Sequence, residues 1–244
     1  MRNVKLTLEY EGTNFFGSQK QKRHQTVQSR LESALRKLFQ KKIKLTFAGR
    51  TDSGAHAEAQ VVNFHTSSEL PLFKIQLGLN HYLPKDIAVT DIEEAPLSFH
   101  AQFDAKRKVY EYRVFNSNVR PVLGRRRAFF YCKRLNVPKM KKAARFFVGR
   151  HDFRAFESSG GRRKSAVRTI SRFEVKKVGK YISFTIESNG FLYKMVRSMV
   201  GTLLSVGSGE IKFPDLREIL VTKNRRLVGP TLPAHGLTLK KIAY

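Results

Sequence analysis

Cysteine, tryptophan and acidic residues are scarce in this chain of 244 residues. It has one cysteine, Cys132, and no tryptophan, and only 19 Asp and Glu stand against 47 Lys and Arg. A single cysteine excludes an internal disulfide and any cysteine-rich zinc site. The 7 histidines are scattered without the HExxH or paired spacing of a metal site, so we expect no metal.

Long apolar stretches are also missing. The segment Ala128–Cys132 is about as continuous as the apolar residues become, far short of the ~18 residues that span a bilayer. Residues 1–10 alternate polar and apolar side chains and lack the uninterrupted apolar core of a signal peptide. Together with the lone cysteine, these features predict a cytoplasmic protein with no membrane partner.

Positive charge is in large excess. The formal net charge is +28 and the sequence pI is about 10.6. Solubility does not require such a charge, so we expect a polyanionic partner, nucleic acid before an acidic membrane surface. The chain also lacks the basic amphipathic helix that favours a membrane surface. The basic residues form local groups: Lys20, Lys22 and Arg23; Lys41, Lys42 and Lys44; Lys106, Arg107 and Lys108; Arg125–Arg127; and Arg162, Arg163 and Lys164.

Aromatic residues lie close to several of these basic groups, at Phe15, Phe16 and Phe129–Tyr131. A basic groove lined with rings suits single-stranded or looped RNA, because unstacked bases can lie on the rings. Packing in the core is the alternative for each ring, since large apolar side chains are usually buried.

Apolar periodicity switches between strand and helix along the chain. Residues 4–10 alternate as in a strand, and residues 27–38 have helical spacing after Thr26, a suitable cap. Further strands are expected near residues 45–47, 60–65, 87–89, 108–116, 169–175, 181–188 and 237–242, and further helices near 70–79, 140–148, 195–203 and 215–221. Short strands mixed with helices, without a GxGxxG motif, predict an α+β fold rather than a Rossmann sheet. We divide the chain into domains 1–104 and 105–244.

The segment 49–57, Gly-Arg-Thr-Asp-Ser-Gly-Ala-His-Ala, places an acid between glycines. Arg50 and Asp52 are two residues apart, so in an extended backbone their side chains share a face and can pair. An acid in such a place can act as a nucleophile or base, with the arginine keeping it ionised. Composition and spacing leave an ordinary turn open. They also favour a packed His56 over a catalytic one.

This segment resembles the catalytic motif G-R-T-D-[AS]-G-V/A-H of the tRNA pseudouridine synthase A family. Further matches to the family occur in the same order along the chain, at Gly17–Gln21, Thr26–Gln28, Leu83–Ile87, Phe99–Phe103, Lys108–Tyr112, Arg168–Ile170 and Asn189–Arg197. An ordered set that spans essentially the whole chain is far more specific than any one motif. Two positions depart from the pattern, because Ser18 stands where the family usually has a large aromatic residue and Gln102 where arginine is common. Both departures concern packing or RNA contact rather than the aspartate.

The resemblance implies a pseudouridine synthase fold. In this fold, two ferredoxin-like (RRM-like) α+β domains share a central, mainly antiparallel sheet, with a basic cleft between them. The first domain carries the aspartate loop and the second completes the cleft. The implied reaction is the isomerisation of uridine to pseudouridine in the anticodon stem–loop of tRNA, at neighbouring positions (38 to 40 in the family). The resemblance further implies a homodimer and no cofactor.

The resemblance also assigns roles to residues. Asp52 matches the family nucleophile, which attacks the sugar or the base, or stabilises a glycosyl cation; the sequence leaves these routes open. Arg50 would pair with Asp52 and help to fill the space left by the extruded base. Tyr110 matches the tyrosine that packs on the uracil, and its phenol is a candidate for proton transfer. The implied substrate-binding residues are Tyr110, Phe191, Lys194 and Arg197, with core packing as the alternative for Tyr110 and Phe191.

Two other classes of function fit part of the pattern. A non-catalytic RNA chaperone explains the charge and the rings but has no need for an acid in a basic site. An aspartate-dependent nucleobase glycosylase on DNA explains the acid, but it releases a free base, whereas an isomerase releases nothing. Product analysis therefore separates the glycosylase from the isomerase.

Overall fold

The structure, a computed structural model, describes residues 1–160 and 165–244. The basic group Arg162, Arg163 and Lys164 lies outside the described residues. The chain forms two compact units: Met1–Lys106 with Thr238–Tyr244, and Arg107–Leu237. The chain therefore changes unit at Lys106, two residues after the expected boundary at 104. Its last seven residues, expected in the second domain, belong to the first unit.

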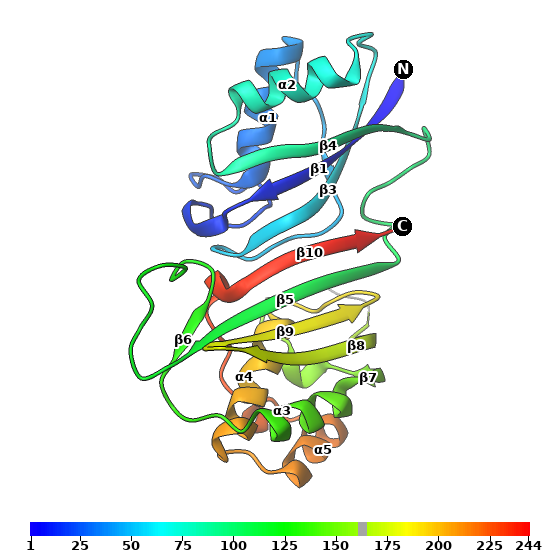
Figure 1. Cartoon of the computed structure of the whole chain (residues 1–244). Coiled ribbons are helices and arrows are strands. Elements are labelled where there is room, and N and C mark those ends of the chain that lie inside the picture. Colours follow the sequence, from blue (N-terminus) through cyan, green and yellow to red (C-terminus); the bar gives the residue numbers. More distant parts are fainter. Residues whose placement is uncertain (161–164) are drawn as a thin grey trace. The chain divides into compact units, whose positions relative to one another are not determined.

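The first unit is built on a mostly antiparallel sheet with the strand order β4-β1-β3-β10 (Figure 1). Its strands are β1 (Arg2–Tyr10), β2 (Thr46–Phe47), β3 (His56–Thr66), β4 (Ile87–Ala95) and β10 (Leu237–Ala243). β1 is antiparallel to both of its neighbours, with Leu6 opposite Val62 on β3 and Ile92 on β4. The short β2 pairs with β3 as well. The alternation of apolar residues in β1 buries Val4, Leu6 and Leu8, as the period of two predicts.

Two helices complete this unit, α1 (Val27–Phe39) and α2 (Leu72–Tyr82). Thr26 caps α1 as predicted, because its side chain accepts a hydrogen bond from the Ser29 N–H and the Ser29 hydroxyl accepts one from the Thr26 N–H. The two helices contact each other, and α2 packs along β4. The order β1-α1-β2-β3-α2-β4 is that of a ferredoxin-like unit.

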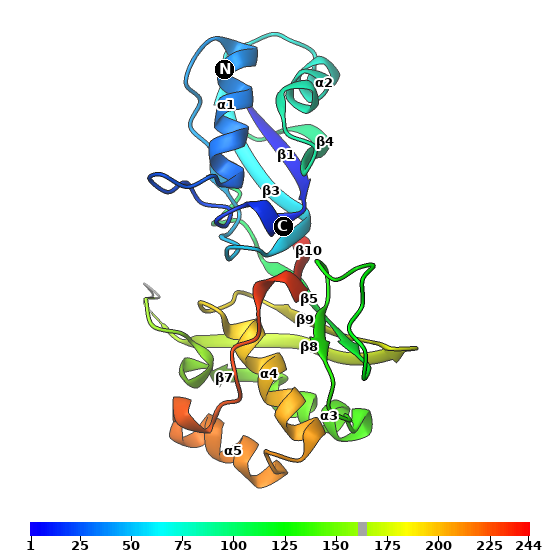
Figure 2. The ribbon, with the colours of Figure 1, turned by 90° about the vertical axis from the view of Figure 1, so that its left-hand side faces the viewer.

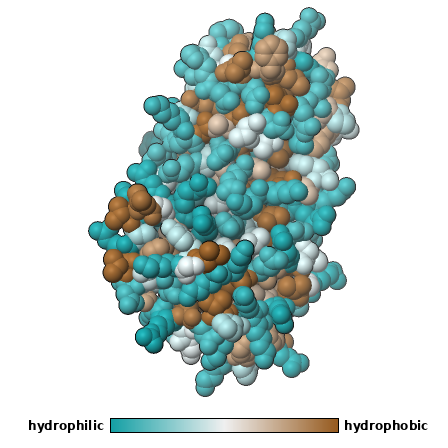
Figure 3. Space-filling model, in the orientation of Figure 1, coloured by the Kyte–Doolittle hydropathy of each residue, from teal (hydrophilic) through white to brown (hydrophobic). Residues whose placement is uncertain are grey.

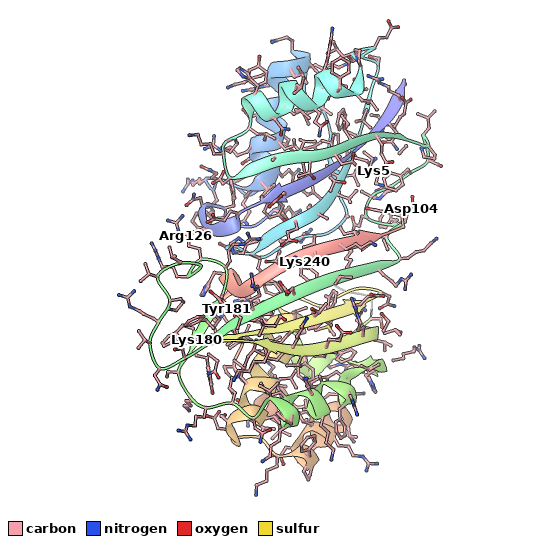
Figure 4. All side chains as sticks on the ribbon, in the orientation of Figure 1. Lys5, Asp104, Arg126, Lys180, Tyr181 and Lys240 are labelled. Atoms are coloured by element: carbon pink, nitrogen blue, oxygen red, sulfur yellow. The ribbon has the colours of Figure 1, made fainter. Side chains whose placement is uncertain are left out.

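β10 joins the first unit from the far end of the chain. It runs parallel to β3, with Thr238 opposite His56 and Leu239 opposite Ala57. Lys240, labelled in Figure 4, forms an ion pair with Glu58 of β3. Parallel pairing requires a long connection, and here the connection is the whole second unit.

The second unit contains an antiparallel sheet with the strand order β5-β9-β8-β7. The strands are β5 (Arg107–Asn116), β7 (Gly149–Asp152), β8 (Val167–Val178) and β9 (Tyr181–Ser188), and β6 (Phe129–Tyr131) pairs in parallel with β5. β5 buries Tyr110, Tyr112 and Val114 on one face, as its alternation predicts.

The helices of this unit are α3 (Val137–Ala144), α4 (Met195–Ser208) and α5 (Phe213–Thr222). α3 and α4 contact each other and pack on β8 and β5 respectively, so they cover the same face of the sheet (Figure 2). α4 is almost wholly buried, and a Cβ at Gly201 would lie 1.8 Å from the Pro230 carbonyl oxygen, so only glycine fits there. When the short strands β6 and β7 are left aside, the order β5-α3-β8-β9-α4 repeats the first five elements of the other unit.

The α+β class predicted from the sequence is confirmed. Within the described part of the chain, no helix has both the length and the apolar character to span a membrane. Over the same residues, no group of His, Cys, Asp and Glu is suited to hold a metal ion.

Candidate active site

Asp52 lies in the loop that joins β2 to β3, at the first position of a tight turn. The Ala55 N–H donates to the Asp52 carbonyl oxygen at 3.1 Å, and Gly54 has a φ of +81°, in the left-handed region that favours glycine. At the entry to the loop, the Gln60 side-chain amide donates to the Gly49 carbonyl at 3.0 Å. The turn that composition suggested is therefore present, and it presents a half-buried carboxylate.

A second loop, between β1 and α1, forms hydrogen bonds with the backbone of the Asp52 turn. Ser18 and Thr51 exchange two hydrogen bonds: the Thr51 N–H donates to Ser18 Oγ at 2.8 Å, and the Ser18 N–H donates to the Thr51 carbonyl at 3.2 Å. The Gly54 N–H donates to the Phe15 carbonyl at 3.2 Å. Gly17 has a φ of +84°, and a Cβ there would lie 2.8 Å from the Thr51 carbonyl oxygen. The two backbones therefore approach as closely as glycine allows.

The other side of Thr51 contacts a buried tyrosine. The Tyr10 and Thr51 hydroxyls lie 2.8 Å apart, and the Gln60 side-chain amide lies 3.5 Å from the same phenol. Burial raises the pKa of Tyr10 to about 12, although the hydrogen bonds to Thr51 and Gln60 lower it in part. Tyr10 therefore stays neutral at physiological pH and acts as a fixed hydrogen-bonding group.

His56 is packed, as predicted. It is buried at the start of β3, and its Nδ1 accepts a hydrogen bond from the Gly12 N–H at 3.0 Å. Arg50 is exposed. The pairing of its side chain with Asp52 stays a prediction.

In the second unit, Tyr110 and Phe191 come together. Tyr110 lies on β5 opposite Ile186 of β9, and Tyr110 is 8% exposed. Phe191 lies between β9 and α4, and the two rings meet edge to face at 5.1 Å between centroids and 90° between planes. This geometry is the preferred one for an aromatic pair, and it holds the ring of Tyr110 in a fixed orientation.

Lys194 and Arg197 follow at the start of α4. Lys194 is the N-cap residue and has a φ of +59°, a conformation that is rare outside glycine, asparagine and aspartate. Its ammonium lies 4.8 Å from the centroid of the Tyr193 ring. The Arg197 Nε donates to the Leu232 carbonyl at 2.6 Å. Strained backbone at such a position is typical of functional sites.

Known proteins of similar sequence identify the family. The sequence model of the family described as tRNA pseudouridine synthase matches residues 7–104 and 143–244. The chain is 43% identical to the tRNA pseudouridine synthase A of Acetivibrio thermocellus and 41% identical to that of Caldicellulosiruptor bescii, over 244 residues and 100% of both chains in each pair. The chain belongs to the tRNA pseudouridine synthase family.

Members of this family are isomerases that convert uridine to pseudouridine in tRNA. Arg50, Asp52, Phe191, Lys194 and Arg197 lie within the residues matched to the family, while Tyr110 lies in the intervening stretch that the full-length relatives cover. A crystal structure of a Cbf5-Nop10-Gar1 complex is also similar, with 11% identity and a TM-score of 0.37 over 83% of this chain and 54% of that one. That likeness is too weak to add to the assignment.

The basic groups expected to meet tRNA lie mainly at the surface. Among the described groups every member is exposed except Lys108, and burial lowers the pKa of Lys108. Figure 3 shows that the visible face is largely hydrophilic. Of the rings expected beside these groups, Phe15 is buried in the core, whereas Phe16 is exposed and stacks on His24 at 4.3 Å.

Sequence reasoning missed the support beneath the Asp52 turn. The sequence predicts strands at Tyr10 and Gln60, and it distinguishes Ser18 only as a departure from the family pattern. The partners of Ser18 and Tyr10 lie 33 and 41 residues away. Among these residues, only the buried position of polar Gln60 in an apolar strand could have signalled a hydrogen-bonded site.

Proposed function

We propose that this chain isomerises uridine to pseudouridine in the anticodon stem–loop of tRNA, at the positions numbered 38 to 40 in the family, without a cofactor. The observation that carries the proposal is the Asp52 turn. A half-buried carboxylate stands on a backbone fixed by hydrogen bonds from two other segments, in a protein of net charge +28. An RNA-binding protein gains nothing from an acid in that place, whereas an enzyme needs one.

Asp52 is the proposed nucleophile. In the reaction the bond between the ribose and uracil N1 breaks, the uracil turns, and C5 is joined to the same ribose carbon. The proton lost from C5 is balanced by one gained at N1, so nothing is consumed or released. A carboxylate can take part by attack on the sugar, by attack on the base, or by stabilising a glycosyl cation.

The other site residues have supporting roles in this proposal. Tyr110 packs on the uracil, and its phenol is a candidate for proton transfer; the edge-to-face contact with Phe191 supports a fixed ring. Lys194 and Arg197 bind the negatively charged substrate, as their charge suits. Arg50 fills the space left by the extruded base, which its exposed position on the loop permits.

The proposal extends to the setting of the enzyme. We infer a cytoplasmic homodimer in which one tRNA contacts both subunits. Light scattering of the purified protein, with and without tRNA, measures the mass of the assembly. A mass equal to one chain at micromolar concentration would contradict the dimer without affecting the chemistry.

Nucleoside analysis tests the activity directly. Unmodified tRNA incubated with the purified protein alone should gain pseudouridine in the anticodon stem–loop. Asp52→Asn keeps nearly the same shape without a carboxylate, so turnover should fall to background while the fold survives. Affinity for tRNA should be equal or slightly higher, because a negative charge is removed from a basic surface.

Single-turnover conditions, with tRNA well above its dissociation constant, give the decisive comparison. Pseudouridine formed by the Asp52→Asn variant at more than a trace of the wild-type rate would show that Asp52 is not essential. Release of free uracil would indicate a glycosylase instead.

A further inference from the structure

Ser18 is a small polar residue in a fully enclosed place. It is 1% exposed, and its hydroxyl oxygen accepts the Thr51 N–H at 2.8 Å. Thr51 is itself only 7% exposed, so bulk water does not offer this N–H a replacement acceptor. The family pattern usually has a large aromatic residue at this position, whereas Ser18 offers a hydroxyl acceptor.

Ser18 is also anchored on its other side. The Gln28 N–H in the first turn of α1 donates to the Ser18 carbonyl at 2.9 Å, and the Val27 N–H donates to the Gly17 carbonyl at 3.3 Å. These N–H groups have no partner within the helix, so the Gly17–Ser18 backbone satisfies them. Since α1 is held in place by its buried side chains, Ser18 connects a rigid helix to the Asp52 turn.

Thr51 directly precedes Asp52, and its backbone and side chain are held by different residues. Ser18 holds the N–H and the carbonyl, while Tyr10 contacts the hydroxyl at 2.8 Å. The peptide bond between Thr51 and Asp52 starts at the Thr51 carbonyl, which accepts the Ser18 N–H. The position of the Asp52 Cα therefore depends on this contact.

We propose that Ser18 is a positioning residue for the reaction, which fixes the Asp52 carboxylate through the backbone of Thr51. The proposal rests on the proposed role of Asp52. Without the Ser18 hydroxyl, the Thr51 N–H would be buried without an acceptor, and the turn would relax to reach water. Small displacements of a reacting group cost rate even when the substrate still binds. The expected loss is therefore in turnover rather than in affinity.

The test compares Ser18→Ala and Ser18→Thr with a matched control, Thr66→Ala. Thr66 is also a buried hydroxyl of the first unit, 3% exposed, and accepts one backbone N–H, from Ser68 at 3.1 Å. It lies at the opposite end of β3 from the Asp52 turn, about 30 Å along the strand. Each variant is measured for its melting temperature, tRNA dissociation constant, single-turnover rate at saturating tRNA, and amide exchange at Thr51.

Ser18→Ala should lower the single-turnover rate by about 10-fold with the dissociation constant within about two-fold of wild type, and should speed exchange at Thr51. Ser18→Thr keeps the hydroxyl and should retain both the rate and the protection. Thr66→Ala should lower the melting temperature without changing the rate.

Three results would overturn the proposal: a folded Ser18→Ala variant with the wild-type rate, a Ser18→Thr variant as slow as the alanine variant, or an equal loss of rate in Thr66→Ala. A wild-type protein that forms no pseudouridine would instead refute the proposed function, so the two failures are distinguishable.

Discussion

Tyr110 combines two chemical groups that can be removed one at a time. Its ring contacts Phe191 edge to face at 5.1 Å, and its hydroxyl lies at the end of the same side chain. Tyr112, two residues along the same face of β5, is a similar buried tyrosine whose hydroxyl donates to the Pro233 carbonyl at 2.7 Å. The two tyrosines thus form a natural pair of test and control.

Tyr110→Phe should keep the ring and lower the single-turnover rate by about 10-fold, because the proposed proton-transfer group is lost. Tyr110→Ala should lose stacking as well, and should also weaken tRNA binding. Tyr112→Phe should lower the melting temperature but leave the rate unchanged, since its hydroxyl serves a structural contact. Equal, near-wild-type rates in both Tyr110 variants would assign this residue to core packing.

The loop between β5 and β6 carries three consecutive arginines. Arg125–Arg127 are all exposed, and the loop turns at Gly124, whose φ is +76° (Arg126 is labelled in Figure 4). The parallel pairing of β5 with β6 fixes both ends of the loop. Three exposed arginines on an anchored loop are well suited to bind phosphates.

Replacing Arg125–Arg127 by glutamine should weaken tRNA binding for all tRNA sequences, while saturating tRNA should restore most of the turnover. The matched control replaces Lys139, Lys141 and Lys142 of α3 by glutamine. These lysines are also exposed, and their replacement removes the same amount of charge. If both triple variants lose affinity equally, net charge rather than this loop is responsible. Binding curves at constant ionic strength make the comparison.

Local sequence patterns predicted the helices and strands better than they predicted which strands pair and which distant segments are in contact. α1 was predicted because Thr26 caps it and its apolar residues repeat at helical spacing, and β5 because its buried residues alternate. The strand at residues 237–242 was also predicted, but its pairing with β3, about 180 residues earlier, leaves no local trace. The Asp52 turn was identified by its motif, whereas its support by Ser18 and Tyr10 depends on contacts between distant segments.

At the scale of the whole molecule, the charge of +28 predicts how binding responds to salt. Each phosphate contact releases counterions and contributes about −0.7 to −0.9 to the slope of log affinity against log salt. We expect a steep slope for tRNA, equivalent to several contacts, and a shallower one for the Arg125–Arg127 variant. Titrations at several salt concentrations measure both slopes. Nearly constant affinity between low and physiological salt would remove the electrostatic argument for RNA binding.

The position of β10 has a consequence for synthesis on the ribosome. Residues 1–106 of the unit that carries Asp52 precede the second unit in the chain, yet β10 can pair with β3 only after all of the second unit has been made. The same delay applies to the bonds from the Lys106 N–H to the Ala243 carbonyl and from the Tyr244 hydroxyl to the Ala101 carbonyl. Until then the edge of β3 that precedes Val61 is an open template for other strands. The unit that carries Asp52 therefore stays incomplete during synthesis, and its open strand edge can mispair while the second unit emerges.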